Sequence, residues 1–342
     1  MATVDQFSQS LLIISNSVGG GGAENAMRNV LNGLVGKLPV HLVALNSDDS
    51  SLKTQDEIII LNRKWGAGFL STTATLFSLR KVLKAINPSV LIVNCELPEL
   101  LTAFSGSWHR KIICVEHTSN PWAGRKFLGV IVRRILLIKR VQWVTVSKDE
   151  KKIWHGGKGA THIPNPVDVP NLGNPRREAN TVFLGRLTQS KRPDWAIHAS
   201  FEAGIELQIF GDGPLMGDLK KNQRELGSRV KFHGYKESCW DQISKDDILL
   251  MPTAFEGDGI VVVQGILAGM RILLADNKDL RRFNLPDICY CKNADEMAQK
   301  LIDMKSVGID QYRATPKVRD ELLLERNLES VSTKWIKYLV QL

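Results

Sequence analysis

The sequence predicts an α/β protein with two Rossmann-like, doubly wound domains that face a central cleft. Short apolar runs alternate with amphipathic stretches along almost the whole chain. Continuous apolar strands separated by helices indicate parallel sheets that are covered on both faces. The alternation is interrupted once, by the Pro- and Asn-rich stretch at 162–180, and then starts again. A chain of 342 residues is also long enough for two domains of ordinary size.

The first half of the chain is expected to form six strands with helices between them. Residues 24–36 carry apolar side chains at helical spacing. A second helix at 76–86 is expected to end before Pro88, because proline disfavours helical geometry in the residue that precedes it. The expected strands are 11–15, 40–45, 57–61, 90–94, 111–117 and 141–147.

The second half repeats the pattern. Residues 260–263 are all β-branched and favour a strand, but the alternation of elements predicts a helix there. The strands of this half are expected within 180–187, 207–213, 229–235, 247–253, 270–276 and 287–291. Further helices are expected at 192–204, 216–227 and 294–305. We therefore expect an N-terminal domain at 1–165, a C-terminal domain at 166–325, and a helix at 326–342 that packs back on the first domain.

The net charge narrows the class of partner. A formal charge of +9 favours a phosphorylated small molecule, a nucleic acid or an acidic membrane face, although basic residues can also simply keep a surface soluble. The basic residues are not interleaved with aromatic ones as in nucleic-acid modules, so nucleic acid is not an expected partner.

The sequence also predicts the cellular location of the protein. The start of the chain lacks the segments of a secretory signal, and no apolar run approaches the roughly 20 residues that span a bilayer. The five cysteines are scattered and lack metal-binding spacing, which favours reduced thiols. We expect a cytoplasmic protein with no bound metal.

A glycine-rich loop follows the first expected strand. In the run from Val18 to Glu24, Gly20 and Gly21 let backbone N–H groups approach an anion at a helix N-terminus. A dinucleotide fingerprint would need a third glycine where Asn25 stands, so a nicotinamide site is disfavoured. A tight turn without a ligand remains the alternative.

Two cations follow the first strand of the second half. Arg186 and Lys191 lie on one strand-to-helix loop, where they can grip a diphosphate, Arg186 through its planar fork and Lys191 as a point charge. Solvated surface charge is the alternative. Gly213 ends the next strand in a turn that turn chemistry alone explains.

A third loop carries an acid between glycines. Glu256 ends an apolar strand, and Gly259 opens the expected helix, whose N-terminus could bind a second anion. A carboxylate beside a phosphate site makes sense if the ligand also carries sugar hydroxyls, which donate to carboxylates. A capping acid in a plain glycine turn would also explain the pattern.

Two further features are ambiguous. His117 ends the strand at 111–117 and could touch a reacting group or be structural.

If residues 124–140 form a helix, then Lys126, Arg133 and Arg140 share one side of it. Apolar residues share another side, which Arg134 interrupts. Such a helix could lie on an anionic membrane or pack on the core with its charges outward.

Several motifs, in order, resemble those of the retaining glycosyltransferases of the GT-B fold, family 4, over almost the whole chain. The motifs are GGGGAEN at 19–25, IPNPVD at 163–168, FLGRLTQSKRPDWAI at 183–197, FGDGP at 210–214, VKFHGY at 230–235 and TAFEGDGIVVVQGILAG at 253–269. One such motif would be weak, but several in this order are specific.

The resemblance implies a role for each site residue. Arg186 and Lys191 would bind the nucleotide diphosphate, and Glu256 would hold donor-sugar hydroxyls. His117 would lie beside the transferred sugar. The remaining donor-site residues would be Gly20, Gly21, Gly213, Tyr235, Lys236, Gly259, Ile260 and Gln264. The family needs no metal, so no cofactor is expected beyond the donor substrate.

The sequence departs from the family pattern at two positions. Gln264 stands where the family keeps a glutamate that contacts the nucleotide ribose, and Val261 replaces a usual proline. Gln264 still offers a carbonyl oxygen but no charge, so ribose binding could be weaker.

The resemblance implies metal-independent, retaining sugar transfer from a nucleotide-diphosphate sugar, with UDP the first expectation and GDP the second. The acceptor would be a glycan or lipid-linked glycan of a bacterial surface polysaccharide, and peripheral contact with the inner face of the cell membrane would run through 124–140. A sugar-nucleotide-binding protein without catalysis and a GT-B-fold epimerase are the alternatives.

Overall fold

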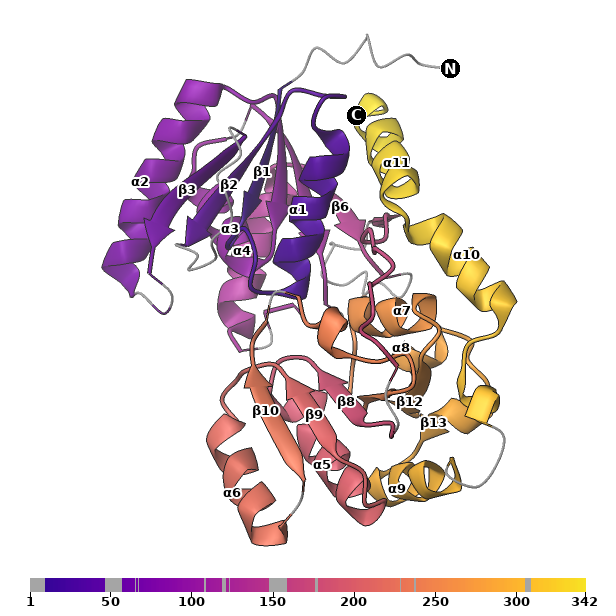
Figure 1. The fold of residues 1–342 in the computed structure, drawn as a ribbon. Coiled ribbons are helices and arrows are strands. Elements are labelled where there is room, and N and C mark those ends of the chain that lie inside the picture. The colour runs from indigo at the N-terminus through magenta and orange to yellow at the C-terminus, as the bar shows by residue number, and fades with distance from the viewer. Residues whose placement is uncertain are drawn as a thin grey trace. The chain divides into compact units, whose positions relative to one another are not determined.

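The computed structural model describes residues 10–46, 57–64, 66, 68–107, 109–118, 121–122, 124–147, 159–175, 178–227, 229–236, 238–304 and 309–342. The chain divides into two compact units (Figure 1). The first unit is Met1–Pro166 together with Arg326–Leu342, and the second is Val167–Glu325. Each unit contains one sheet in which every strand pairing is parallel, so the predicted fold class is confirmed.

The first sheet has the strand order β3-β2-β1-β4-β5-β6-β7. Its strands are β1 (Leu11–Ser15), β2 (Val40–Asn46), β3 (Ile58–Arg63), β4 (Val90–Asn94), β5 (Lys111–Glu116), β6 (Gln142–Thr145) and β7 (Thr161–His162). Its helices are α1 (Gly22–Leu34), α2 (Phe69–Ile86), α3 (Glu96–Phe104), α4 (Lys126–Ile138) and α11 (Leu328–Val340). Strand β7 falls at the start of the stretch that the sequence pattern left without structure.

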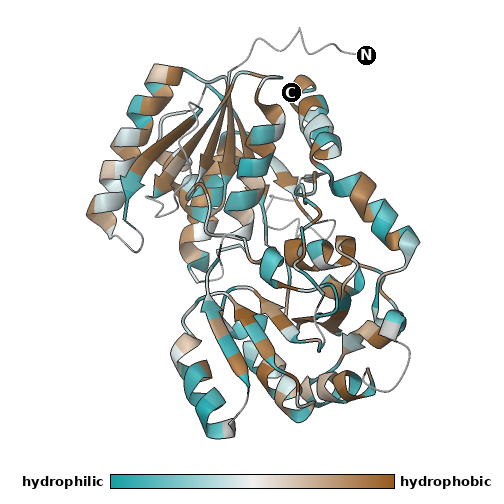
Figure 2. Ribbon diagram, in the orientation of Figure 1, coloured by the Kyte–Doolittle hydropathy of each residue, from teal (hydrophilic) through white to brown (hydrophobic). Residues whose placement is uncertain are grey.

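The apolar strands of this sheet are buried on both faces, as their uninterrupted hydrophobicity predicted. In β1, Leu11 and Ile13 pack in one cluster with residues of α1 and α11, whereas Leu12 and Ile14 pack in another with residues of α2, α3 and α4. Figure 2 shows these strands as a hydrophobic centre between helices of mixed character. The C-terminal helix α11 therefore belongs to the core of the first unit.

The second sheet has the strand order β10-β9-β8-β11-β12-β13. Its strands are β8 (Thr181–Leu184), β9 (Leu207–Phe210), β10 (Val230–Gly234), β11 (Ile248–Met251), β12 (Arg271–Ala275) and β13 (Tyr290–Cys291). The helices are α5 (Pro193–Glu202), α6 (Met216–Leu226), α7 (Ile260–Leu267), α8 (Lys278–Arg281), α9 (Ala294–Asp303) and α10 (Pro316–Arg326). Residues 287–289 form a short 3-10 turn instead of the expected strand, which is limited to Tyr290 and Cys291.

Helix α7 confirms the helix predicted over the β-branched run. Gly259 occupies its N-cap in the left-handed region (φ 73°), and a Cβ there would come within 2.6 Å of the Phe283 ring. Val262 and Val263 are fully buried. Tertiary packing therefore overrides the weak helix propensity of this segment.

Helix α4 contradicts part of the sequence interpretation. Arg133, which was placed on an exposed basic side, is only 3% exposed, whereas Phe127 and Ile138 are 83% and 71% exposed. The neighbouring Arg134 is exposed. The interpretation failed because two carboxylates from other elements neutralise Arg133, and helical spacing carries no information about them.

Among the described residues, no helix is long and apolar enough to cross a membrane.

Candidate functional site

Three loops of the second unit leave the carboxyl ends of neighbouring strands. They join β8 to α5, β9 to α6 and β11 to α7, and these strands are adjacent in the order β9-β8-β11. The strand order reverses between β8 and β11, which is where open α/β sheets bind ligands. The loops carry Arg186 and Lys191, Gly213, and Glu256 respectively.

The first two loops lie directly against each other. A Cβ on Gly211 would come within 1.9 Å of the Gly185 carbonyl oxygen, and one on Gly213 within 2.5 Å of the Leu187 carbonyl oxygen. The Leu187 N–H donates to the Asp212 carbonyl at 2.9 Å. Glycines are therefore required at both positions by the close approach of the two backbones.

The first and third loops are joined by hydrogen bonds and an ion pair. The Ala254 N–H and the Thr253 hydroxyl both donate to the Ser190 carbonyl, at 2.8 and 3.1 Å. Beside them, Lys191 Nζ lies 2.5 Å from Glu256 Oε2. The structure thus brings together two residues that the sequence placed 65 positions apart.

Arg186 differs from Lys191 in its surroundings. Its side chain is exposed, and in the described part of the chain it forms no ion pair or side-chain hydrogen bond. Arg186 is therefore an available cation of the first loop, whereas the charge of Lys191 is already balanced by Glu256.

The other predicted donor residues lie on the same unit. Ile260 begins α7, and Gln264 lies one turn later and is half-buried. Tyr235, just after β10, is 52% exposed. Lys236 Nζ donates to Gln242 Oε1 at 2.5 Å.

The glycine loop of the first unit precedes α1. Gly20 is exposed with φ 88°, and Gly21 is the N-cap of α1. Neither glycine lines the cavity described next.

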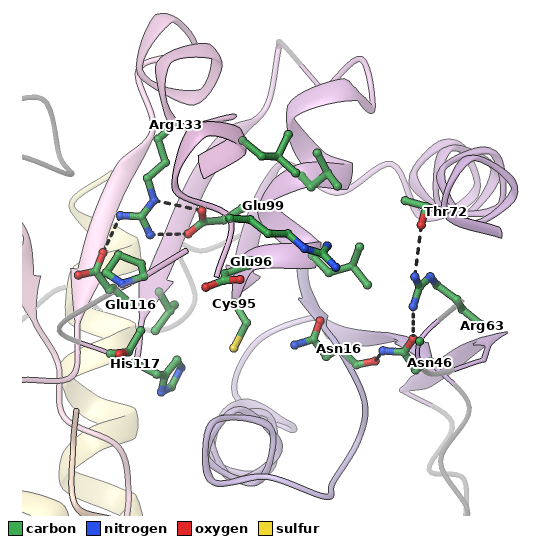
Figure 3. A pocket seen from close by; sticks show the side chains of 18 of the residues that line it. Asn16, Asn46, Arg63, Thr72, Cys95, Glu96, Glu99, Glu116, His117 and Arg133 are labelled. Carbon is green, nitrogen blue, oxygen red and sulfur yellow. Dashed lines mark hydrogen bonds and ion pairs between the residues drawn. The ribbon is translucent and has the colours of Figure 1, made fainter. Parts of the chain in front are cut away.

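The first unit contains a cavity of about 580 Å³ among β2, β3, β5, α2, α3 and α4. His117 lines it, directly after β5 (Figure 3). Its Nδ1 lies 3.3 Å from Asn165 Nδ2. Cys95 also lines the cavity, and burial raises the pKa of its thiol, so that this sulfur stays protonated.

A buried ion cluster forms one side of the cavity. Arg133 donates to Glu99 through Nη2 at 2.9 Å and through Nε at 3.2 Å, and to Glu116 through Nη1 at 2.8 Å (Figure 3). The Trp122 indole N–H also donates to Glu99, at 2.8 Å. Burial raises the pKa of Glu99, and the Arg133 guanidinium opposes that shift. The cluster ties α3 and α4 to β5, beside His117.

Two further cations, besides Arg133, line the same cavity. Arg63, at the end of β3, donates to Asn46 Oδ1 at 3.0 Å and to Thr72 Oγ1 at 3.2 Å. Arg125, the N-cap residue of α4, is the other cation. Sequence reasoning did not single out Arg63 or Glu99, because no local motif marks them, and it noted Arg125 only as part of the basic stretch at 124–140.

In the described ranges, no group of three or more His, Cys, Asp or Glu side chains is arranged to hold a metal ion.

Comparison with known families gives two matches. Residues 20–170 match the family model of Glycosyltransferase Family 4, and residues 178–306 match that of Glycosyl transferases group 1.

Individual proteins agree with these matches. The O-antigen biosynthesis glycosyltransferase WbnH of Escherichia coli is 29% identical over 228 residues, which cover 59% of this chain and 62% of that protein. The alignment thus spans less than two thirds of that relative. A Campylobacter jejuni α-1,4-N-acetyl-D-galactosaminyltransferase, whose name gives a diphospho-undecaprenol-linked glycan, is 22% identical over 76% of this chain and 80% of its own.

The fold has close structural counterparts. Anabaena HepE, solved in complex with UDP-glucose, superposes with a TM-score of 0.79 at 14% identity. The superposition covers 98% of this chain and all of the other.

Proposed function

Since the chain belongs to glycosyltransferase family 4, we propose that it transfers a sugar from a nucleotide-diphosphate sugar to a glycan or lipid-linked glycan in bacterial surface polysaccharide synthesis. The observation that carries this proposal is the convergence of three loops in the second unit. They present an available arginine, an ion-paired lysine and a carboxylate at one edge of the sheet.

We assign the donor diphosphate to Arg186 and Lys191, and hydroxyls of the donor sugar to Glu256. Backbone N–H groups at Gly259 and Ile260 lie at the N-terminus of α7, where the helix dipole favours an anion. Gln264 would accept from the ribose, and Tyr235 and Lys236 would lie near the base. A UDP-sugar is the proposed donor, supported by the UDP-glucose complex of the similar Anabaena protein.

The Lys191–Glu256 pair gives this site a specific property. A diphosphate at Lys191 would compete with the Glu256 carboxylate for the ammonium group. Donor binding would therefore release Glu256 to accept hydrogen bonds from sugar hydroxyls, so that carboxylate and donor engage together.

We further propose that transfer retains the anomeric configuration, with His117 beside the transferred sugar and the leaving phosphate assisting on the same face. The anomeric proton coupling of the product, measured by NMR, would settle the configuration, and an inverted product would overturn this proposal.

Peripheral contact with an anionic membrane is also proposed for 124–140. The exposed face of α4 carries Phe127, Ile131, Arg134 and Ile138, and Lys126 is exposed beside them. Exposed apolar side chains next to cations suit the interface of an acidic bilayer. Co-sedimentation with phosphatidylglycerol vesicles should be lost in the Phe127→Ser, Ile138→Ser double variant. If the double variant binds these vesicles as well as the wild type does, α4 is excluded as the membrane contact.

Calorimetry with UDP-, GDP- and ADP-sugars tests the donor site. Arg186→Ala should weaken binding of the preferred donor at least tenfold, whereas Arg224→Ala, an exposed arginine on α6, should not. Full binding by Arg186→Ala would refute the assignment.

Turnover of a radiolabelled donor separates the possible activities. Release of nucleotide that depends on added bacterial glycolipid supports transfer. Conversion of the donor alone into an epimer would indicate an epimerase, and binding without any turnover would indicate a binding protein.

A further inference from the structure

A fourth loop at the carboxyl edge of the second sheet lies beside the loop that carries Glu256. It joins β12 to α8 and consists of Asp276 and Asn277. Strand β12 pairs with β11 in parallel, so the two loops leave neighbouring strands at the same edge. No motif in the sequence marks this fourth loop, and only the fold shows what it contacts.

The side chain of Asp279, on α8, binds the backbone of Glu256. Its Oδ2 accepts a hydrogen bond from the Glu256 N–H at 3.0 Å, and the residue is only 6% exposed. Burying a carboxylate costs free energy unless hydrogen bonds replace its hydration, and a hydrogen bond to a carboxylate is stronger than one between neutral groups. Asp279 therefore fixes Glu256 at the backbone, whereas Lys191 binds its side chain.

Asn277 supports the same contact from the fourth loop. Its Nδ2 donates to the Thr253 carbonyl at 2.9 Å. Its Oδ1 accepts from the backbone N–H groups of Asp279 and Leu280, at 3.1 and 3.2 Å, and so caps α8. One side chain thus joins the loop of Glu256 to the helix that carries Asp279.

The loop of Glu256 is consequently held on two sides. On the side of the first loop, the Ser190 carbonyl accepts two hydrogen bonds from it. On the side of β12, Asp279 and Asn277 bind it. A side chain that binds a ligand must be held to within about 0.5 Å by the groups around it. Asp279 and Asn277 are suited to that purpose for Glu256.

We propose that Asp279 is a positioning residue for the donor sugar. By accepting from the Glu256 N–H, it fixes the backbone from which the Glu256 carboxylate reaches the sugar hydroxyls. This inference rests on the proposed function for the role of Glu256. Since Glu256 is assigned to the sugar, loss of Asp279 should affect binding of the sugar part of the donor more than binding of the nucleotide.

Calorimetry with UDP and with a UDP-sugar tests the proposal. The UDP-sugar is whichever of UDP-glucose, UDP-galactose and UDP-N-acetylgalactosamine binds the wild type most tightly. Asp279→Ala should weaken binding of this UDP-sugar at least tenfold and change the affinity for UDP less than threefold. Asp279→Asn keeps an oxygen that can accept from the Glu256 N–H, so it should bind the UDP-sugar within threefold of the wild type.

Asp247 provides the matched control. It is fully buried, and its carboxylate accepts from the backbone N–H groups of Asn180 and Ser244, both at 2.8 Å. It precedes β11 and so lies at the opposite edge of the sheet from the donor loops. Asp247→Ala should lower stability and leave both affinities within threefold of the wild type. An equal loss of UDP-sugar affinity in Asp247→Ala and Asp279→Ala would overturn the positioning role.

A second variant covers the case in which Asp279→Ala does not fold. Asn277 is half-buried, and Asn277→Ala removes both the hydrogen bond to Thr253 and the cap of α8. It should show the same selective loss of UDP-sugar affinity. Wild-type affinity for the UDP-sugar in the folded variant, whether Asp279→Ala or Asn277→Ala, would overturn the proposal.

Hydrogen exchange separates this proposal from the proposed function. Without any nucleotide, amides in a peptide that covers 253–259 should exchange at least tenfold faster in Asp279→Ala than in the wild type or in Asp279→Asn. If exchange rises in this way but the wild type binds no nucleotide sugar, the proposed function fails and the positioning of the loop by Asp279 stands. Wild-type exchange in Asp279→Ala would overturn the positioning itself.

Discussion

Replacing Arg133 with methionine tests whether the buried cluster of the first unit holds α3 and α4 on the sheet. The Glu99 and Glu116 side chains are 2% and 4% exposed, and both lose their cation in this variant. Removing one partner of a buried ion pair typically costs about 3–5 kcal/mol. Arg133 also stacks over the Trp143 ring at 4.7 Å, which adds about 1 kcal/mol.

Protonation limits this cost. A buried carboxylate without a cation can take up a proton, and for a glutamate of ordinary pKa this costs about 3.7 kcal/mol at pH 7 but only about 1.6 kcal/mol at pH 5.5. The native variant would then bind more protons than the unfolded chain, so its free energy of unfolding falls as the pH rises. We expect Arg133→Met to lose about 4 kcal/mol at pH 7 and roughly half of that at pH 5.5.

Urea unfolding followed by tryptophan fluorescence measures the loss, because Trp122 and Trp143 both contact the cluster. The control is Arg134→Met, which removes an exposed arginine from the same helix and should change stability by less than about 0.5 kcal/mol. The reasoning fails if the free energies of unfolding of the two variants differ by less than about 1 kcal/mol at pH 7. It also fails if the stability that Arg133→Met loses relative to the wild type grows as the pH falls.

Three changes in the second unit give further tests. Gly213→Ala should weaken UDP binding at least tenfold in calorimetry, because its Cβ would meet the Leu187 backbone. Gly217→Ala, where a Cβ meets nothing, is the control and should not weaken binding. Equal UDP affinities of the two variants would contradict the loop contact. Glu256→Gln should lower the rate of sugar transfer at least tenfold with little change in melting temperature, since its ion pair is partly exposed; an unchanged rate would exclude Glu256 from the site. Gln264→Glu should tighten donor binding about fivefold, because hydrogen bonds to a charged acceptor are stronger by about 1 kcal/mol; unaltered affinity would separate Gln264 from the ribose.

The parts of the fold that could be predicted are those set by local pattern. Short uninterrupted apolar runs such as 11–15 favour strands buried on both faces, and their alternation with helices favours parallel sheets. The same alternation gave the helix at Ile260–Leu267 against its β-branched composition. The resemblance to family 4 assigned Lys191 and Glu256 to one donor site. The adjacency of β8 and β11, which brings their loops to one edge, and the ion pair itself could not be foreseen.

The parts that could not be predicted depend on partners distant in the sequence. Arg133 and Arg134 are consecutive and chemically identical, yet one is buried and the other exposed. The difference lies in Glu99 and Glu116, which are 34 and 17 residues away from Arg133. Arg63, at the end of β3, is likewise bound by Asn46 on β2 and Thr72 on α2, and only the packing of α2 on the folded sheet brings the three together.

Arg133 and Arg63 lie on opposite sides of the first unit's cavity, and each joins elements that are distant in the sequence (Figure 3). On one side, Arg133 is fully engaged by Glu99 and Glu116, and a neutralised, buried cluster can fix the backbone beside His117 but cannot attract a ligand. On the other side, the Arg63 guanidinium donates to Asn46 on β2 and to Thr72 on α2, so these hydrogen bonds hold two neighbouring elements together at the cavity wall.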